Sequence, residues 1–132
     1  MYATTLRGDP AQIYRSVDVA SRVGSASPHR LIALLYEDLE VALRQAAFAT
    51  ERRQFEAKSQ RLTKALAILF ALEAGLDHVK GGDLAATLSR VYRGARERIT
   101  NASVTGDADE LRSVAEGVNE IAGAWKQIQG LS

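Results

Sequence analysis

The side chains best suited to chemistry in this chain are two histidines, His29 and His78, and 16 acidic residues. A di-iron carboxylate site in a helical protein needs Glu-x-x-His motifs that project inward, and neither histidine stands three residues after a glutamate. The chain has no cysteine, and its single methionine is Met1. Thiolate ligands are therefore excluded, and so is a methionine ligand to haem from inside a helix. The sequence predicts no metal, haem or other cofactor.

Nucleotide binding and nucleophilic catalysis have no clear signature either. The segment 80–83 (Lys-Gly-Gly-Asp) lacks the remaining glycines and the Lys-Ser/Thr pair of a nucleotide-binding loop, and it is more typical of a helix end followed by a turn. Serines are common, but both histidines are expected near helix ends, so no catalytic triad can be named. Glu37 and Glu40 are interpreted as a solvated helix face. We expect a protein that is not an enzyme.

One catalytic alternative centres on His78. Histidine phosphotransfer modules are four-helix bundles that present a phosphorylated histidine in mid-helix, close to a lysine and a glycine. The segment His78-Val79-Lys80-Gly81 is similar to that pattern, although it has one residue between His and Lys-Gly where those modules have two. His78 is also expected at the C-terminal end of a helix, where a polar residue that faces the helix dipole is the simpler interpretation.

Length and charge narrow the classes of protein further. A chain of 132 residues is one domain by length and can bury a core. Its 17 basic and 16 acidic residues give a net charge of +1, which provides no electrostatic reason to expect nucleic acid or an anionic membrane as partner. No apolar run approaches the roughly 20 residues that cross a bilayer, and the N-terminus lacks the pattern of a signal peptide. We expect a cytoplasmic protein without membrane insertion.

The apolar pattern predicts an all-α protein. Both prolines, Pro10 and Pro28, lie in the first quarter of the chain, and the β-branched and aromatic runs typical of strands are absent. Short connections make sequential helices antiparallel neighbours, so we predict an antiparallel up-down-up-down four-helix bundle over 28–132. An N-terminal arm and linker, 1–27, precedes it and includes the pattern of a short helix. The four long helices are expected at about 28–48, at about 53–77, from Asp83 to about 104, and from Asp107 through Ile128.

Capping residues indicate where three of these helices begin. Ser27 is a natural N-cap, because its hydroxyl can accept from an early unpaired N–H group, and Pro28 fits the first helical position. Asp83, after two glycines, is the expected N-cap of the third helix. Asp107 and Glu110 have the spacing of a capping box at the start of the fourth.

Each helix has one apolar stripe that is expected to face the core. Trp125 lies in the middle of a regular three-four pattern in the fourth helix and is expected to be buried there. The stripes also place Phe55 in the second helix, and Leu84 and Val91 in the third, toward the interior.

Two helices have more apolar residues than one buried stripe requires. Leu34, Val41 and Phe48 lie seven residues apart on a second stripe of the first helix. In the second helix, Ile68 lies about 100° from the core centre, with Phe70 nearly as far on the other side. An aligned apolar row on a surface predicts a groove for an amphipathic helix or an extended apolar segment of another chain. Alternatively, the N-terminal arm covers this row. The two interpretations are compatible if the arm covers the groove only while the partner is absent.

A series of motifs, in the same order and at similar spacing, resembles a known family over almost all of the chain from Tyr14 to Ile128. That family is the FliS family of flagellar secretion chaperones. The matching pieces are Tyr14, Ala26-Ser27-Pro28, Leu34-Leu35-Tyr36-Glu37, Lys64-Ala65, Leu72-x-x-x-Leu76-Asp77, Gly81-Gly82-Asp83-Leu84-Ala85, Val91-Tyr92, Asp109-x-Leu111 and Ala124-Trp125.

The resemblance implies a small cytosolic four-helix bundle without cofactor. Members bind the disordered C-terminal region of flagellin, hold it unpolymerised and deliver it to the flagellar type III export gate. The family's Tyr-bearing arm lies near the binding track, so Tyr14 and Val17 are candidate gate residues by resemblance. Tyr36 fits either the track or the core, where its hydroxyl would need a partner. The candidate partner-binding residues are Tyr14, Val17, Leu34, Tyr36, Val41, Phe48 and Ile68.

The expected partners are therefore flagellin and a component of the export gate, and the expected state is a monomer or weak homodimer. Two hypotheses of other classes stay open beside this one. The first is a phosphorelay module built on His78. The second is a structural bundle that only oligomerises through the apolar stripe of its first helix.

Overall fold

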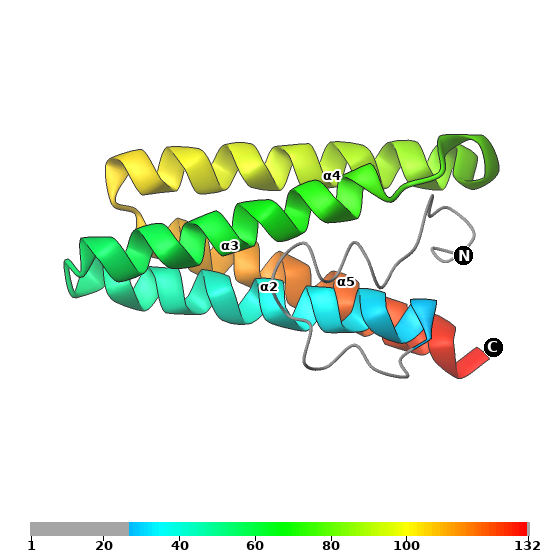
Figure 1. Ribbon diagram of the computed structural model, residues 1–132, viewed down its shortest axis with the longest axis horizontal. Helices are drawn as coiled ribbons and strands as arrows, with labels where there is room; N and C mark the ends of the chain where they lie inside the picture. Colours follow the sequence, from blue (N-terminus) through cyan, green and yellow to red (C-terminus); the bar gives the residue numbers. More distant parts are fainter. Residues whose placement is uncertain (1–26, 132) are drawn as a thin grey trace.

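The computed structural model describes residues 27–131, with side chains through Ile128. In this range the chain forms four helices and no strand, which confirms the all-α prediction (Figure 1). The expected N-terminal arm, with Tyr14 and Val17, lies outside the described residues apart from Ser27. The helices are α2 (Pro28–Glu51), α3 (Phe55–Ala74), α4 (His78–Thr105) and α5 (Ala108–Leu131).

The four helices pack as the predicted antiparallel bundle. α2 lies between α3 and α5 and has the most extensive contacts with both, while α4 closes the ring against α3 and α5. In the view of Figure 1, α3 and α4 form one layer and α2 and α5 form the other. Small side chains such as Ala42, Ala46 and Ala47 are fully buried on α2, and they let its neighbours approach closely.

Two of the three expected helix starts are confirmed. The Ser27 hydroxyl accepts a hydrogen bond from the Arg30 N–H at 3.1 Å, and Pro28 occupies the first turn of α2. At α5, the Asp107 carboxylate accepts from the Glu110 N–H at 3.0 Å. The Glu110 carboxylate accepts from the Arg98 guanidinium of α4, so only the aspartate half of the expected capping box is formed.

The predicted start of the third helix, at Asp83, was wrong. α3 ends at Ala74, and Asp77 is the N-cap of α4, with its carboxylate accepting from the Val79 and Lys80 N–H groups at 3.0 and 3.1 Å. α4 then kinks at Gly82, where φ is 50° and ψ is −125°, a conformation that favours glycine. Because Asp77 offers a cap before the glycines, the helix begins ahead of them. His78 consequently lies in the first turn of α4 and not at the end of the preceding helix.

The core combines apolar residues of all four helices and includes Trp125, as predicted. The Trp125 indole N–H donates to the backbone carbonyl of His29 at 2.9 Å, and the two rings stack with centroids 4.0 Å apart. Phe55, Leu84 and Val91 were expected to face the interior, but they are exposed by 61%, 44% and 40%. Phe55 begins α3 at the end of the bundle, and α4 packs less extensively than α2, so these side chains are only partly covered.

Two negative findings apply to the described part of the chain. None of its helices is long and apolar enough to span a membrane. No group of three or more His, Cys, Asp or Glu residues within it is placed to hold a metal ion.

Candidate functional site

The turn between α2 and α3 fixes one end of the candidate site. Arg53 adopts the left-handed conformation with φ of 56°. Its N–H donates to the Thr50 carbonyl, and the Gln54 N–H donates to the Ala49 carbonyl at 2.9 Å. This pair of bonds closes the helix end in a Schellman motif, with arginine where glycine is usual. The tight closure folds the start of α3 back along α2.

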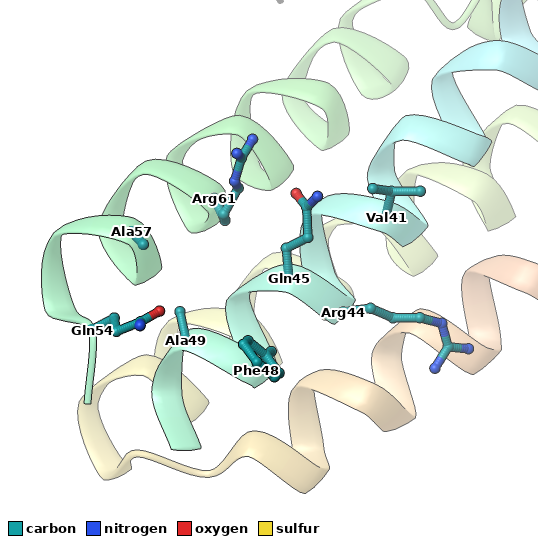
Figure 2. A pocket seen from close by; sticks show the side chains of 8 residues that line it. All are labelled: Val41, Arg44, Gln45, Phe48, Ala49, Gln54, Ala57 and Arg61. Atoms are coloured by element: carbon teal, nitrogen blue, oxygen red, sulfur yellow. The ribbon is translucent and has the colours of Figure 1, made fainter. Parts of the chain in front are cut away.

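A groove of about 430 Å³ lies between α2 and α3 beside this turn (Figure 2). Its main apolar side chains are Val41 and Phe48 of α2, which are 52% and 51% exposed. Ala49 of α2 and Ala57 of α3 also line the groove, and their small side chains leave space between the two helices. The lining residues are Val41, Arg44, Gln45, Phe48, Ala49, Gln54, Ala57 and Arg61.

The rim of the groove is polar and basic. The Arg44 guanidinium donates to the Glu40 carboxylate at 3.1 Å, and the Arg52 guanidinium lies 4.6 Å from the centre of the Phe48 ring. Gln45 of α2 and Arg61 of α3 lie on the two sides of the opening, and their side chains extend in the same direction in Figure 2. Apolar side chains bordered by amide and guanidinium groups suit an amphipathic segment whose apolar face turns inward. The lining residues include no nucleophile beside a base, so the groove is suited to binding.

A second hollow of about 150 Å³ lies between α2, α4 and α5, and its lining is almost entirely apolar. Leu84 and Leu88 of α4 lie at one side of it, and Leu84 is 44% exposed. No signal in the sequence predicts this hollow, because the apolar pattern of α4 is typical of a fully covered stripe. The lining residues are Tyr36, Leu84, Leu88, Ile121, Ala124, Trp125 and Ile128.

Comparison with known proteins decides the family. The family model described as flagellar protein FliS matches residues 10–132, which is nearly the whole chain. The chain belongs to the FliS family. This confirms the resemblance seen in the sequence motifs.

Three FliS relatives cover most of this chain. The flagellar secretion chaperone FliS of Salmonella typhimurium is 40% identical over 116 residues, which are 87% of this chain and 86% of that protein. FliS of Vibrio cholerae is 35% identical over 89% of this chain and 86% of its own length. The flagellar secretion chaperone FliSB of Pseudomonas aeruginosa is 35% identical over 87% of this chain and 91% of its own. The relatives are named as chaperones, a role that involves no catalysis.

The structure separates the apolar residues that were predicted to bind a partner. Val41 and Phe48 are exposed beside the groove, as expected, but Leu34 and Ile68 are exposed by only 3% and 0%. The prediction assumed that only one face of each helix is covered. α2 and α3 each lie between two neighbouring helices, so side chains well away from the core centre are covered too. Whether Val41 and Phe48 contact a partner of this FliS-family chain stays a prediction.

Tyr36 belongs to the core. Its side chain is 1% exposed, and its hydroxyl lies 2.7 Å from that of Tyr92. Burial raises the pKa of Tyr36 to about 12, and the hydrogen bond with Tyr92 offsets only part of that rise. The ring also forms part of the wall of the second hollow. Tyr36 can therefore shape that hollow while its hydroxyl stays protonated.

His78 does not have the setting of a phosphotransfer residue. It is exposed in the first turn of α4, before the kink at Gly82, and not in the middle of a helix. The similarity of this segment to phosphotransfer modules thus rests on the sequence alone.

Proposed function

We propose that this FliS-family protein is a flagellar export chaperone that binds the disordered C-terminal region of flagellin in the cytosol. It keeps flagellin from polymerising prematurely and delivers it to the flagellar type III export apparatus. The observation that carries the proposal is the α2–α3 groove, where Val41 and Phe48 are half exposed beside a polar rim. Membership of a family whose relatives are named flagellar secretion chaperones supports it.

The groove favours a client that folds as it binds. A disordered segment loses conformational entropy when it is ordered, and it must bury a large apolar surface to offset that cost. Val41 and Phe48 alone offer too little surface. The apolar hollow beside Leu84 is a second place where the same segment can bury side chains. A disordered chain can reach both, because it is able to wrap around a bundle.

The proposed contact residues are Val41 and Phe48. Leu34, Tyr36 and Ile68 are buried, so their proposed part is to support the walls of the binding surface. Tyr14 and Val17 stay predicted gate residues outside the described part of the chain. The proposal requires no cofactor and no catalysis, and its working state is a monomer or weak homodimer.

Calorimetric titration with a peptide from the C-terminal region of the same organism's flagellin tests the proposal. Saturable binding with a strongly negative heat-capacity change is expected, because that sign reports apolar burial and coupled folding. Absence of heat at several temperatures, with the protein shown to be folded, would contradict it. Labelling of His78 by a phosphate donor would then favour the phosphorelay hypothesis, and a stable dimer indifferent to any peptide would favour the oligomerising bundle.

A further inference from the structure

The two layers of the bundle carry opposite charge. α3 and α4 together hold eight basic and four acidic residues, whereas α2 and α5 hold four basic and eight acidic residues. The α3–α4 layer therefore has a net charge of +4 and the α2–α5 layer of −4, although the whole chain is close to neutral. A field of this kind attracts an acidic partner toward α3 and α4.

The α3–α4 layer also exposes an aromatic ring that is stacked against an arginine. Phe70 of α3 is 63% exposed, and the Arg96 guanidinium of α4 lies 4.4 Å from the centre of its ring. Arg93, one turn before Arg96, has 69% of its side chain exposed. Phe70, Glu73, Ala74, Arg93 and Arg96 line a shallow hollow of about 260 Å³, and we call this surface the Phe70 face.

Glu73 holds both arginines in place. Its carboxylate accepts from Arg93 Nε at 2.6 Å, from Arg96 Nη1 at 2.6 Å and from the Ser89 hydroxyl at 2.8 Å. Burial acts to raise the pKa of Glu73, but the hydrogen bonds from Arg96, Ser89 and Arg93 outweigh it and lower the pKa to about 2. Glu73 is thus ionised at neutral pH, and the guanidinium groups are fixed before any partner arrives. Fixed side chains lose less entropy on binding.

The fixed arginines retain donors for a ligand. Arg93 uses its Nε toward Glu73, and its two terminal nitrogens have no hydrogen-bond partner among the described residues. A carboxylate can accept from such a guanidinium edge in a bidentate manner. Phe70 beside it offers a surface for an apolar side chain.

We propose that the Phe70 face docks an acidic, amphipathic segment of another protein, with carboxylates on Arg93 and an apolar side chain on Phe70. This surface is separate from the α2–α3 groove. Phe70 follows Arg61, which lines that groove, by nine residues, or about two and a half helical turns, so it lies on the opposite side of α3. The inference goes beyond the proposed function, because flagellin in the groove would leave the Phe70 face accessible.

A partner protein fits this face better than a second copy of the chain. The acidic surface of a second copy would be its α2–α5 layer, so the contact would join two different surfaces. Such a contact does not close a dimer and leads to open chains of molecules. A chaperone that must keep its client unpolymerised has no use for that arrangement.

The experiment uses a defined probe and the whole protein. The probe is a fluorescein-labelled amphipathic peptide of glutamate, alanine and leucine, and its counterpart has glutamine in place of every glutamate. Fluorescence anisotropy is expected to show binding of the acidic probe that weakens with added salt, and much weaker binding of the counterpart. Arg93→Gln is expected to reduce the affinity roughly two- to fivefold, and Phe70→Ala roughly fivefold.

Lys126→Gln is the matched control, because it removes one positive charge from an exposed position on α5. It is expected to leave probe binding within about twofold of the unmodified protein. Both test residues are exposed, and circular dichroism verifies that the variants fold. Equal binding of both peptides, or equal losses in Arg93→Gln and Lys126→Gln, would overturn the proposal.

Two further measurements separate this inference from the proposed function. Phe70→Ala and Arg93→Gln are expected to leave the affinity for the flagellin peptide unchanged, and a parallel loss would assign the Phe70 face to the flagellin site and overturn a separate surface. Sedimentation that shows self-association abolished by Phe70→Ala would identify the occupant as a second copy and likewise overturn it. If flagellin does not bind at all, the probe titration still decides the Phe70 face.

Discussion

The hydroxyl groups of Tyr36 in α2 and Tyr92 in α4 lie 2.7 Å apart in the interior of the bundle. α2 and α4 are diagonal helices, and their backbones make few close contacts with each other. The two tyrosines therefore link the diagonal helices α2 and α4 through the core, whereas the other helix contacts are between neighbours. A buried hydroxyl without its partner costs free energy, so this pair favours one register of α4 against α2.

Tyr36→Phe is expected to lower the free energy of unfolding by about 1 to 2 kcal/mol, because the Tyr92 hydroxyl loses this buried partner. Urea denaturation measures the change. Tyr92→Phe should behave similarly, and the double variant should lose less than the two single losses together, since the bond is broken only once. Strictly additive losses would show that the two hydroxyls act independently.

His29 is expected to make the protein less stable in mild acid. Its ring is buried against Trp125, both ring nitrogens lack a hydrogen-bond partner in the described structure, and burial lowers its pKa from the ordinary value of 6.5. As pH falls below about 6.5, the unfolded chain binds a proton before the folded one does, so stability decreases toward the lower folded pKa. Comparison of urea midpoints above and below that pH measures the loss. The fluorescence of Trp125, the single tryptophan, follows unfolding.

The variant His29→Phe keeps a ring against Trp125 and is expected to show a smaller loss of stability on acidification. His78→Asn is the control, because it removes an exposed histidine from the first turn of another helix, α4. An identical pH profile in His29→Phe and in the unmodified protein would show that carboxylates alone cause the acid loss.

Glu73→Gln is expected to reduce the free energy of unfolding by roughly 1 to 3 kcal/mol at neutral pH, because charge-assisted bonds to Arg93 and Arg96 become weaker. The folded pKa of about 2 lies below the ordinary 4.5, so the carboxylate's contribution is present above about 4.5 and is lost as pH falls toward 2. The gap between variant and unmodified protein should therefore close over that range. Glu116→Gln, at an exposed position of α5, should show no such gap at any pH.

Arg53→Gly is expected to raise the free energy of unfolding by about 0.5 to 1 kcal/mol, because a left-handed φ strains residues that have a Cβ atom. Thermal or urea unfolding measures the gain. Arg52→Gly, one residue earlier at φ of −88°, is the matched control and should not stabilise, since a negative φ does not place the residue in the left-handed region that favours glycine. A loss of stability in Arg53→Gly would indicate that the arginine's contact with the Phe55 ring matters more than the strain.

Val41→Glu is expected to weaken binding of the flagellin peptide roughly tenfold or more, because a carboxylate would be desolvated against the apolar client. Helicity by circular dichroism should hardly change, since Val41 is half exposed. Val104→Glu, at an 84% exposed position near the end of α4, is the control and should bind normally. Unchanged affinity in Val41→Glu would remove Val41 from the site.

The candidate site was predictable only in part. Val41 and Phe48 follow from their seven-residue spacing, since the surplus of apolar residues on α2 is visible in the sequence. Leu34 has the same spacing and yet is buried, because the extent to which neighbouring helices cover this side of α2 changes along its length. Arg61 could not be assigned to the groove, since no local pattern tells which side of α3 turns toward α2.

The Phe70 face was beyond the reach of sequence analysis for a similar reason. Phe70 was placed away from the core centre, which its exposure confirms. Arg93 and Arg96 follow Glu73 by 20 and 23 residues in the chain. They meet its carboxylate only because α3 and α4 pack in one register.

The sequence by itself determined the all-α fold, the order of the helices and the starts of α2 and α5. These features depend on apolar periodicity and on caps such as Ser27 and Asp107, whose hydrogen bonds reach no more than three residues along the chain. The tertiary structure alone decided which apolar side chains remain exposed and which charges meet. Burial and pairing are properties of helix positions relative to one another, and those positions are set by the packing of the whole bundle.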